Sequence, residues 1–336
     1  GQMKRLLDNF AGLIVRPAVN LIVFPALIGL LPMPGGAIFS APMVKDLGKR
    51  HRMNGAQLSF TNYWFRHIWE YWWPLYPGVL LTVSIAGLNL WSFVLLLFPL
   101  TPVAVAAGMW PLKTALDNGE NGSVADTGLT TDSNLALFLK ELTPIGIVIG
   151  LGLGLGMVFS TAAPDFGIAK ESGLIVALVL AIAWVWRKNR LEPARIRKLV
   201  LSPKLASMFV MVVSILIFKG VLEDSQAVEA VSRELVRWHI PLVPVTIVMP
   251  FLVGTVSGIT IAFVGTTFPV LISLVQNLHS DPYLLPYLML ALVGGFIGVL
   301  LSPVHLCLLL SNEYFQTTLP AVYRQLWAPC LVLLLC

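Results

Sequence analysis

The chain carries two long apolar segments that are interrupted in the same way, one in each half. In the first, residues 24–42, a Pro-x-x-x-Gly pattern runs into a break at Gly35 and Gly36 and ends at a proline. In the second, residues 249–269, the same pattern runs into small residues at 255–258 and again ends at a proline. In a membrane, a broken helix is tolerated only where it is buried in protein or lines a wet cavity. Two matching breaks therefore predict the substrate site of a secondary transporter.

The composition is that of a chain surrounded mostly by lipid. Hydrophobic residues make up 57% and charged residues 12% of its 336 residues, whereas soluble domains carry roughly 25% charged residues. The mean hydropathy is +0.82, and the length allows about ten spans of ~20 residues each. The net charge of +5 is not gathered on a polar domain, so nucleic acid is not an expected partner. The three cysteines lack a metal-binding spacing, and no cofactor is expected.

The apolar segments predict an all-α polytopic membrane protein made of two repeats. Each repeat is expected to hold a re-entrant helical hairpin followed by a broken transmembrane helix. The first repeat covers residues 1–110, a polar loop covers 111–142, and the second repeat covers 143–336. The expected elements, in chain order, are hairpin 17–50, broken helix 57–87, spans 90–108, 144–162, 173–187 and 204–220, hairpin 241–277, broken helix 284–311 and last helix 314–336.

The placement of charge predicts opposite orientations for the two hairpins. Basic residues flank the base of the first hairpin and gather again at residues 187–198. An even number of expected spans separates the two clusters, so the positive-inside rule places both in the cytoplasm. An odd number of spans separates the hairpins, so the repeats are expected to be inverted, as in many alternating-access carriers. The spans before the second hairpin have no counterpart before the first. The natural protein is therefore expected to have about three further N-terminal helices.

The breaks of the two hairpins supply the first candidate site residues. Glycine there exposes backbone N–H groups, and helix N-termini favour an anionic group such as a carboxylate. Hydroxyl groups nearby can bond a ligand or offer oxygens to Na⁺, which is expected near Thr255, Ser257 and Thr266. The simpler structural interpretation is a kink in which each hydroxyl bonds its own turn. The residues expected to line the site are Gly35, Gly36, Ser40, Ser257, Gly258, Thr266 and Thr267.

Two further motifs add polar residues beside the breaks. In the run 62–70, Asn62 and Glu70 share one helical face with Arg66, and His67 lies beside them. This run is either an interfacial helix with a surface ion pair or the wall of a substrate cavity. His305 follows a Ser-Pro break between long apolar runs. A lone histidine there is a structural residue or a proton or substrate contact. Asn62, His67 and His305 complete the set of substrate-binding candidates.

These motifs resemble a known family. Residues 29–42 with the run 62–70 resemble an uncharacterised prokaryotic integral-membrane family, a domain of unknown function grouped with the ion transporter superfamily. Residues 302–315 are similar to the corresponding region of gluconate permeases in that superfamily. The resemblance implies a homodimeric, elevator-type carrier with a scaffold part and a mobile part that holds both hairpins. Relatives move gluconate, lactate, citrate and dicarboxylates with Na⁺ or H⁺, and others are cation/proton antiporters. Neither tip has the Ser-Asn-Thr triplet of the dicarboxylate carriers.

The sequence therefore predicts an inner-membrane symporter of a small organic anion, driven by Na⁺ or H⁺ and not an enzyme. A cation/proton antiporter on the same fold is one alternative, and it requires a membrane-embedded carboxylate such as Glu70 or Glu313. An integral-membrane enzyme is a second alternative, and it requires His67, His305 and Glu70 to converge. A non-transporting subunit of a membrane complex is the third.

Overall fold

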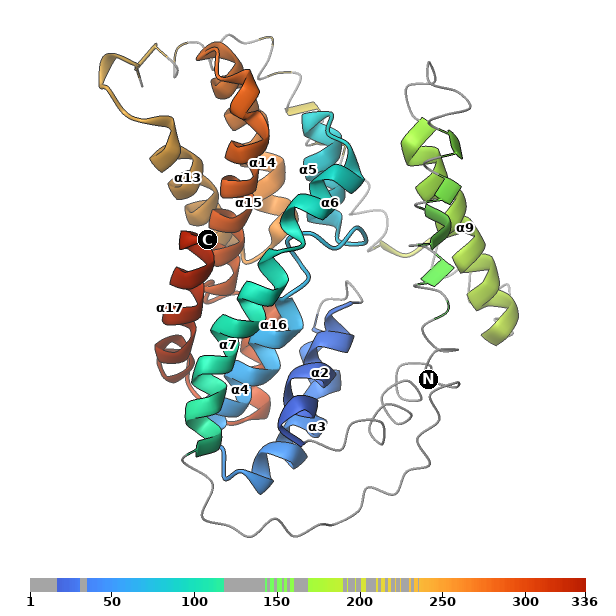
Figure 1. Cartoon of the computed structure of the whole chain (residues 1–336), viewed down its shortest axis with the longest axis vertical. Helices are drawn as coiled ribbons and strands as arrows, with labels where there is room; N and C mark the ends of the chain where they lie inside the picture. Colours follow the sequence, from blue (N-terminus) through green and yellow to red (C-terminus); the bar gives the residue numbers. More distant parts are fainter. Residues whose placement is uncertain are drawn as a thin grey trace. The chain divides into compact units, whose positions relative to one another are not determined.

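A computed structural model of the chain describes residues 17–30, 35–117, 169–189 and 238–336, together with scattered residues between 143 and 159 and between 192 and 237. In this part of the chain all regular structure is helical (Figure 1). The chain divides into two compact units. The larger unit, residues 16–125 and 212–336, holds both apolar segments that are broken in the sequence. The smaller unit comprises residues 1–15 and 126–211.

Each interrupted segment forms a pair of helices. The first pair is α2 (Pro17–Gly29) and α3 (Ala37–Arg50), and the second is α13 (Leu242–Ser257) and α14 (Thr260–Asn277). The two members of each pair contact one another. The turn between α13 and α14 is made by Gly258, whose φ of 63° suits glycine. These helices lie within residues 17–50 and 241–277, where the hairpins are expected, and their re-entrant position in a membrane stays a prediction.

Each hairpin is followed by a helix that is broken in the middle. In the first half, α4 (Gly55–Trp64) passes into a short 3-10 helix, η1 (Phe65–His67), before α5 (Pro77–Ala86) begins. In the second half, α15 (Leu284–Leu300) stops at the Ser-Pro break, and α16 (Leu306–Tyr314) follows. The start of α4 is fixed by a capping box, because Asn54 and Gln57 bond each other's backbone N–H groups.

The glycine of each Pro-x-x-x-Gly pattern lies where another backbone segment approaches closely. A Cβ added at Gly29 would overlap the carbonyl oxygen of Arg66, and one added at Gly254 would overlap the carbonyl oxygen of Gly295. Each glycine thus lets the first arm of its hairpin press against the backbone of the broken helix that follows. In the second half this contact extends along α13 and α15, where Gly298 lies against the backbone of Phe251.

The two halves contact each other through equivalent helices. The second arm of the first hairpin, α3, packs against α16 of the other half, and the second arm of the second hairpin, α14, packs against α5. At the second contact, a Cβ added at Gly78 would overlap the side chain of Thr260 with its Cγ2 only 2.5 Å away. The helices that end each half, α7 (Leu100–Asp117) and α17 (Leu319–Leu335), also pack together.

Three elements differ from the expected boundaries. The span expected at 90–108 consists of α6 (Leu90–Leu97) and α7, with a turn at Phe98 and Pro99 between them. Helix α7 runs to Asp117, further than the start of the polar loop expected at residue 111, and the rest of that loop lies outside the described residues. The last helix begins at Leu319 rather than at residue 314.

In the smaller unit, α9 (Ala169–Asn189) covers the span expected at 173–187. It is apolar except at its ends, and Lys188 in its last turn lies over the ring of Trp184. The spans expected at 144–162 and 204–220 fall largely outside the described residues.

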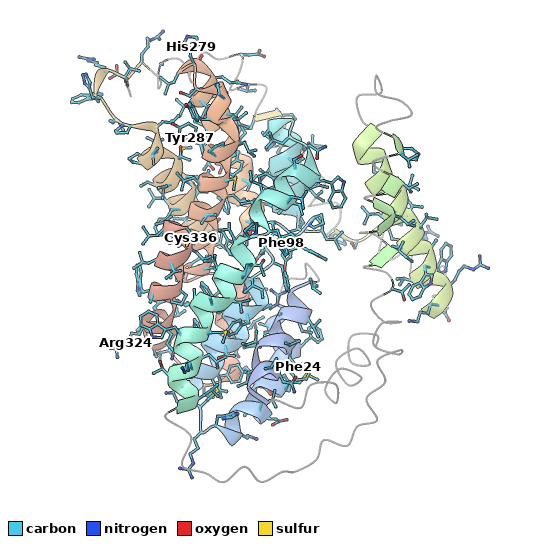
Figure 2. All side chains as sticks on the ribbon, in the orientation of Figure 1. Phe24, Phe98, His279, Tyr287, Arg324 and Cys336 are labelled. Atoms are coloured by element: carbon cyan, nitrogen blue, oxygen red, sulfur yellow. The ribbon has the colours of Figure 1, made fainter. Side chains whose placement is uncertain are left out.

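Among the described residues, two helical stretches are long and apolar enough to cross a bilayer: Leu90–Leu116, which comprises α6 and most of α7, and Thr260–Asn277. Five shorter helices are also apolar. Several large apolar side chains of the larger unit are exposed, including Leu95 at 73%, Trp110 at 65% and Phe98 at 50%. Phe98 is labelled in Figure 2. Exposed apolar surface of this kind marks contact with a membrane or another protein. The structure is therefore all-α and compatible with a membrane protein.

Candidate functional site

The tip of the first hairpin lies against Arg66. Gly35 has a φ of 72°, a conformation that suits glycine, and Gly36 follows it at the start of α3. A Cβ added at Gly36 would overlap the Arg66 guanidinium and come within 2.8 Å of its Nε. Arg66 is buried, with 3% of its surface exposed. The first hairpin thus brings two glycines to a buried cation.

The tip of the second hairpin lies against the break of the second broken helix. A Cβ added at Gly258 would lie 3.0 Å from Ser302 Oγ and 3.1 Å from the backbone nitrogen of His305. Ser302 is fully buried and His305 is 7% exposed. Each hairpin tip therefore meets a broken helix at the point where its backbone is irregular.

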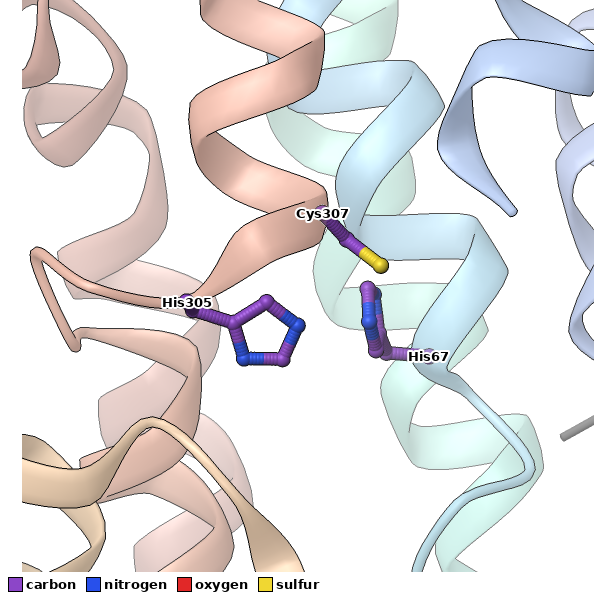
Figure 3. Close-up of side chains that lie close together, drawn as sticks. All are labelled: His67, His305 and Cys307. Atoms are coloured by element: carbon purple, nitrogen blue, oxygen red, sulfur yellow. The ribbon is translucent and has the colours of Figure 1, made fainter. Parts of the chain in front are cut away.

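The two breaks meet each other at a pair of histidines (Figure 3). The rings of His67 and His305 lie edge to face, with centroids 5.0 Å apart, and the ring of Tyr63 contacts both. His67 is 2% exposed. The Nδ1 atom of His305 is buried and has no hydrogen-bond partner in the part of the chain that the structure describes. Both histidines are candidates from the sequence, but the spacing of residues along the chain does not show that they lie together.

The contacts of His67 assign its tautomer. Its Nδ1 lies 2.6 Å from the carbonyl oxygen of Tyr63, and its Nε2 lies 3.3 Å from Nη1 of Arg66. A carbonyl only accepts a hydrogen bond and a guanidinium only donates one. Neutral His67 therefore carries its proton on Nδ1 and a lone pair on Nε2. The same Nε2 lies 3.7 Å from Oε2 of Glu70, whose side chain is 14% exposed.

Asn62 ties the two halves together one turn before the histidine. It accepts a hydrogen bond from Ser40 Oγ at 2.6 Å, and its Nδ2 donates to the carbonyl of Ala37 at 3.0 Å and to Ser311 Oγ at 2.9 Å. One amide thus joins α3, α4 and α16. Asn62 and Ser40 are both fully buried.

A second hydrogen bond repeats this link between α4 and α16. Ser59 Oγ donates to Oδ1 of Asn312 at 2.5 Å, while Nδ2 of Asn312 is buried without a hydrogen-bond partner among the described residues. Arg66 and Glu70 were considered from the sequence but are not in the predicted substrate-binding set, and Ser59, Ser311 and Asn312 were not predicted. The runs 62–70 and 311–315 contained most of them, but neither run indicates which polar side chains face inward.

The hydroxyl groups of the second hairpin bond their own helices. Thr255, Thr266 and Thr267 each donate to the carbonyl four residues earlier, at 2.8, 2.8 and 2.7 Å. Ser257 makes a 3.4 Å contact with the backbone of Ile259. Among the described residues no hydrogen bond links these hydroxyls to the histidine pair. The geometry is that of the kink interpretation, and a Na⁺ site near Thr255, Ser257 and Thr266 stays a prediction.

The space beside the histidines is small. A cavity of about 10 Å³ adjoins His67 and is otherwise lined mainly by apolar side chains, among them Trp64, Ile68 and Phe296. This volume holds roughly one water molecule. Both histidines are almost fully buried in this conformation, and a substrate would need the surrounding helices to move.

Cys307 lies beside the two histidines, and ligand atoms of the three residues are all within 4.8 Å of one another (Figure 3). These residue types occur in zinc and copper sites. However, the lone pair on Nε2 of His67 already faces Nη1 of Arg66. A metal cation bound there would lie beside a buried positive charge, so we do not assign a metal site to this cluster.

The larger unit thus defines a class: all-helical proteins in which two helical hairpins press against two broken helices around a buried polar centre. The chain belongs to the DUF401 family of proteins of unknown function, whose family model matches residues 1–336. This agrees with the resemblance to a family of unknown function. Membership of the ion transporter superfamily stays a prediction. A comparison with curated proteins finds no match to the chain.

Proposed function

We propose that this protein is a secondary active transporter of a small organic anion, most simply a carboxylate, in the inner membrane. Transport is coupled to Na⁺ or H⁺ and proceeds by alternating access. The observation that carries the proposal is the buried Arg66 guanidinium, which lies against the glycine tip of a helical hairpin and beside two broken helices.

The chemistry around Arg66 supports an anionic substrate. A buried guanidinium is a planar donor suited to carboxylates, and exposed backbone N–H groups at a glycine turn favour the same ligands. Beside His67, Nδ1 of His305 is buried without a hydrogen-bond partner among the described residues. Unpaired buried polar atoms are costly in a folded protein, and a bound anion with hydroxyl groups would satisfy this one.

The equivalent contacts of the two halves support an inverted-repeat architecture. In both halves a glycine four residues after a proline presses the hairpin against the broken helix that follows, and in both the second hairpin arm packs against the other half. Inverted repeats of this kind place the substrate near the bilayer midplane. The topology from the positive-inside rule, with the first hairpin base and residues 187–198 in the cytoplasm, belongs to this proposal.

An elevator motion fits the division of the chain into two units. The larger unit holds both hairpins and both broken helices, which is what a mobile transport part must contain. The smaller unit, with α9, would contribute to the scaffold, which in a homodimer is completed by a second copy. The bilayer itself is the other expected partner.

A cation/proton antiporter is the second candidate, because Glu70 is largely buried beside His67. An antiporter would move Na⁺ or K⁺ against protons without any organic anion. The convergence of His67, His305 and Glu70 also meets the requirement of the membrane-enzyme alternative. An enzyme would return a changed product, whereas a carrier delivers its substrate intact.

The test is uptake into proteoliposomes that contain the full-length protein. Labelled gluconate, lactate, citrate and succinate are offered under an inward Na⁺ gradient or an inward proton gradient, and the internal label is identified chemically. We expect at least one anion to accumulate unchanged. Cation-driven proton release without any anion uptake would favour the antiporter, and a converted product would favour the enzyme.

The matched variants are Gly36→Leu and Gly258→Leu, compared with Gly150→Leu. Leucine at position 36 overlaps the Arg66 guanidinium, and leucine at 258 is strained at a φ of 63°. A side chain at Gly150 would meet nothing within 4 Å among the described residues. We expect the first two variants to reach the membrane but lose uptake, and the control to keep it. Full uptake by both tip variants would refute the assignment of the site to the tips.

A further inference from the structure

The Nε2 atom of His67 lies between a cation and a carboxylate. Nη1 of Arg66 is 3.3 Å away and Oε2 of Glu70 is 3.7 Å away, while Nδ1 is held at 2.6 Å from the carbonyl of Tyr63. All three charged or titratable side chains belong to one short stretch that includes the irregular end of α4. A proton bound to the lone pair on Nε2 would therefore change the hydrogen-bond partner of the His67 ring.

We infer that Nε2 of His67 binds the coupling proton, and that protonation moves its hydrogen bond from Arg66 to Glu70. This inference rests on the proposed function and deepens it, because it selects H⁺ over Na⁺ as the coupling ion. It also gives the anion and the proton a shared site.

The exchange of partners follows from the donor and acceptor character of each group. Neutral His67 accepts a hydrogen bond from Arg66 through Nε2. When a proton binds, an N–H bond forms at Nε2, and two donors then face each other, so the contact with Arg66 breaks. The new N–H donates to Oε2 of Glu70 as a charge-assisted hydrogen bond. Release of the proton on the other side of the membrane reverses each step.

The same exchange couples the proton to the anion. Once Nε2 of His67 no longer accepts from Arg66, the N–H group on Nη1 can donate to a substrate carboxylate at the tip of the first hairpin. Proton binding therefore favours anion binding, and by linkage the anion favours the proton to the same extent. One proton moved with one monovalent anion leaves the net charge of the transport cycle unchanged.

The groups around His67 are consistent with this role for Glu70. His67 shares its site with a second imidazole, a thiol, a guanidinium and phenols; the guanidinium only donates hydrogen bonds, and the others are weaker acceptors for a protonated imidazole than a carboxylate is. Glu70 is the carboxylate among the described groups that face Nε2. The titratable and charged groups that surround His67 and its two partners are Tyr63, Arg66, Glu70, Tyr76, His305 and Cys307.

The experiment follows proton and anion together. Proteoliposomes with the full-length protein enclose a pH-sensitive dye and receive gluconate, lactate, citrate or succinate in Na⁺-free buffer. We expect the transported anion to acidify the interior, with one proton entering per monovalent anion. Uptake that requires Na⁺ and leaves the internal pH unchanged would overturn the proton site while leaving the anion carrier intact. Failure of all four probes would count against the proposed function and this inference together.

Two substitutions distinguish a loss of proton coupling from a loss of folding. Glu70→Gln removes the anion that receives the protonated imidazole, and we expect uptake driven by a proton gradient to fall roughly tenfold or more, as for the loss of a charge-assisted hydrogen bond. His67→Gln removes the proton-binding nitrogen, and the expected result is loss of internal acidification. The controls are the same substitutions at exposed positions, Glu313→Gln and His279→Gln. Proton-coupled uptake at the wild-type rate in both site variants would refute the inference.

A second measurement does not depend on transport. Nitrogen NMR of ¹⁵N-histidine in the purified protein reports which ring nitrogen carries a proton, and His67→Gln assigns the signal. We expect His67 to carry its proton on Nδ1 at alkaline pH and to gain a second proton on Nε2 on acidification. A neutral ring with its proton on Nε2, or a ring that stays neutral at the pH at which uptake is driven, would contradict the proposal.

Discussion

The imidazole of His67 meets the imidazole of His305 edge to face, 5.0 Å between centroids, although the two residues come from opposite halves of the chain. The contact forms because a helix is interrupted beside each histidine, at η1 in the first half and between α15 and α16 in the second. Each break is in turn covered by the glycine tip of a hairpin. The polar centre of the larger unit thus lies where the two interrupted helices meet.

Replacing Gly29 or Gly254 with alanine is expected to destabilise the fold. The added methyl group would overlap backbone carbonyls of Arg66 and Gly295, which cannot move aside as a flexible side chain can. Overpacking of this kind costs about 1–3 kcal/mol of unfolding free energy. Thermal unfolding of the full-length protein in detergent measures it, with Gly150→Ala as the control. Melting temperatures equal to that of the control would show that the hairpins do not press on the broken helices.

Asn62→Ala tests the amide that joins α3, α4 and α16. It removes three hydrogen bonds and leaves Ser40 and Ser311 buried without this partner, so we expect a loss of about 1–3 kcal/mol in stability. Thr61→Val is the control, because Thr61 is also buried and its hydroxyl donates to the carbonyl of Gln57 in its own helix. Equal melting temperatures of the two variants would show that the amide network is not formed as described.

A double-mutant cycle on Ser59 and Asn312 tests the contact between the two halves. Their side chains share a hydrogen bond of 2.5 Å from α4 to α16. Residues in direct contact show coupling energies of about 0.5–3 kcal/mol, whereas distant ones add independently. We therefore expect the Ser59→Ala and Asn312→Ala variants to be non-additive in thermal unfolding. Strict additivity would place α4 and α16 apart.

The elements that the sequence predicts well are those marked by prolines and glycines. The breaks at Gly35, Gly258 and the Ser-Pro pair at 302–303 determine where helices must stop, so the hairpins and broken helices could be placed from the chain alone. The packing role of Gly29 and Gly254 could not be predicted from the sequence, because close packing depends on which backbone segment lies opposite each glycine. The end of α7 was also missed, since Lys113, Thr114 and Asp117 interrupt the apolar pattern of its last turns and resemble the polar loop that follows.

The residues of the site could be predicted only in part from the sequence, for a similar reason. Gly36, Ser40, Asn62, His67, Gly258 and His305 lie around the meeting point of the two breaks, as a sequence with two interrupted segments suggests. The threonines of α14 carry equally suitable hydroxyls, but each bonds its own helix. Arg66 gave no signal that separated it from an interfacial residue, because a sequence shows the spacing of charges along a helix and not which face is buried. Its partners on the hairpin tip come from a distant part of the chain.

Binding of a small organic anion at Arg66 is the central claim, and a thermal-shift measurement tests it most directly. The purified full-length protein is heated with gluconate, lactate, citrate or succinate, with and without Na⁺, at two pH values. A ligand at a hundredfold excess over its dissociation constant stabilises the folded state by about 2.7 kcal/mol. We predict that at least one of these anions raises the melting temperature of the wild-type protein, more at the lower pH, and has no effect on Gly36→Leu. An absence of stabilisation by any of them, or equal stabilisation of the Gly36→Leu variant, would contradict the account.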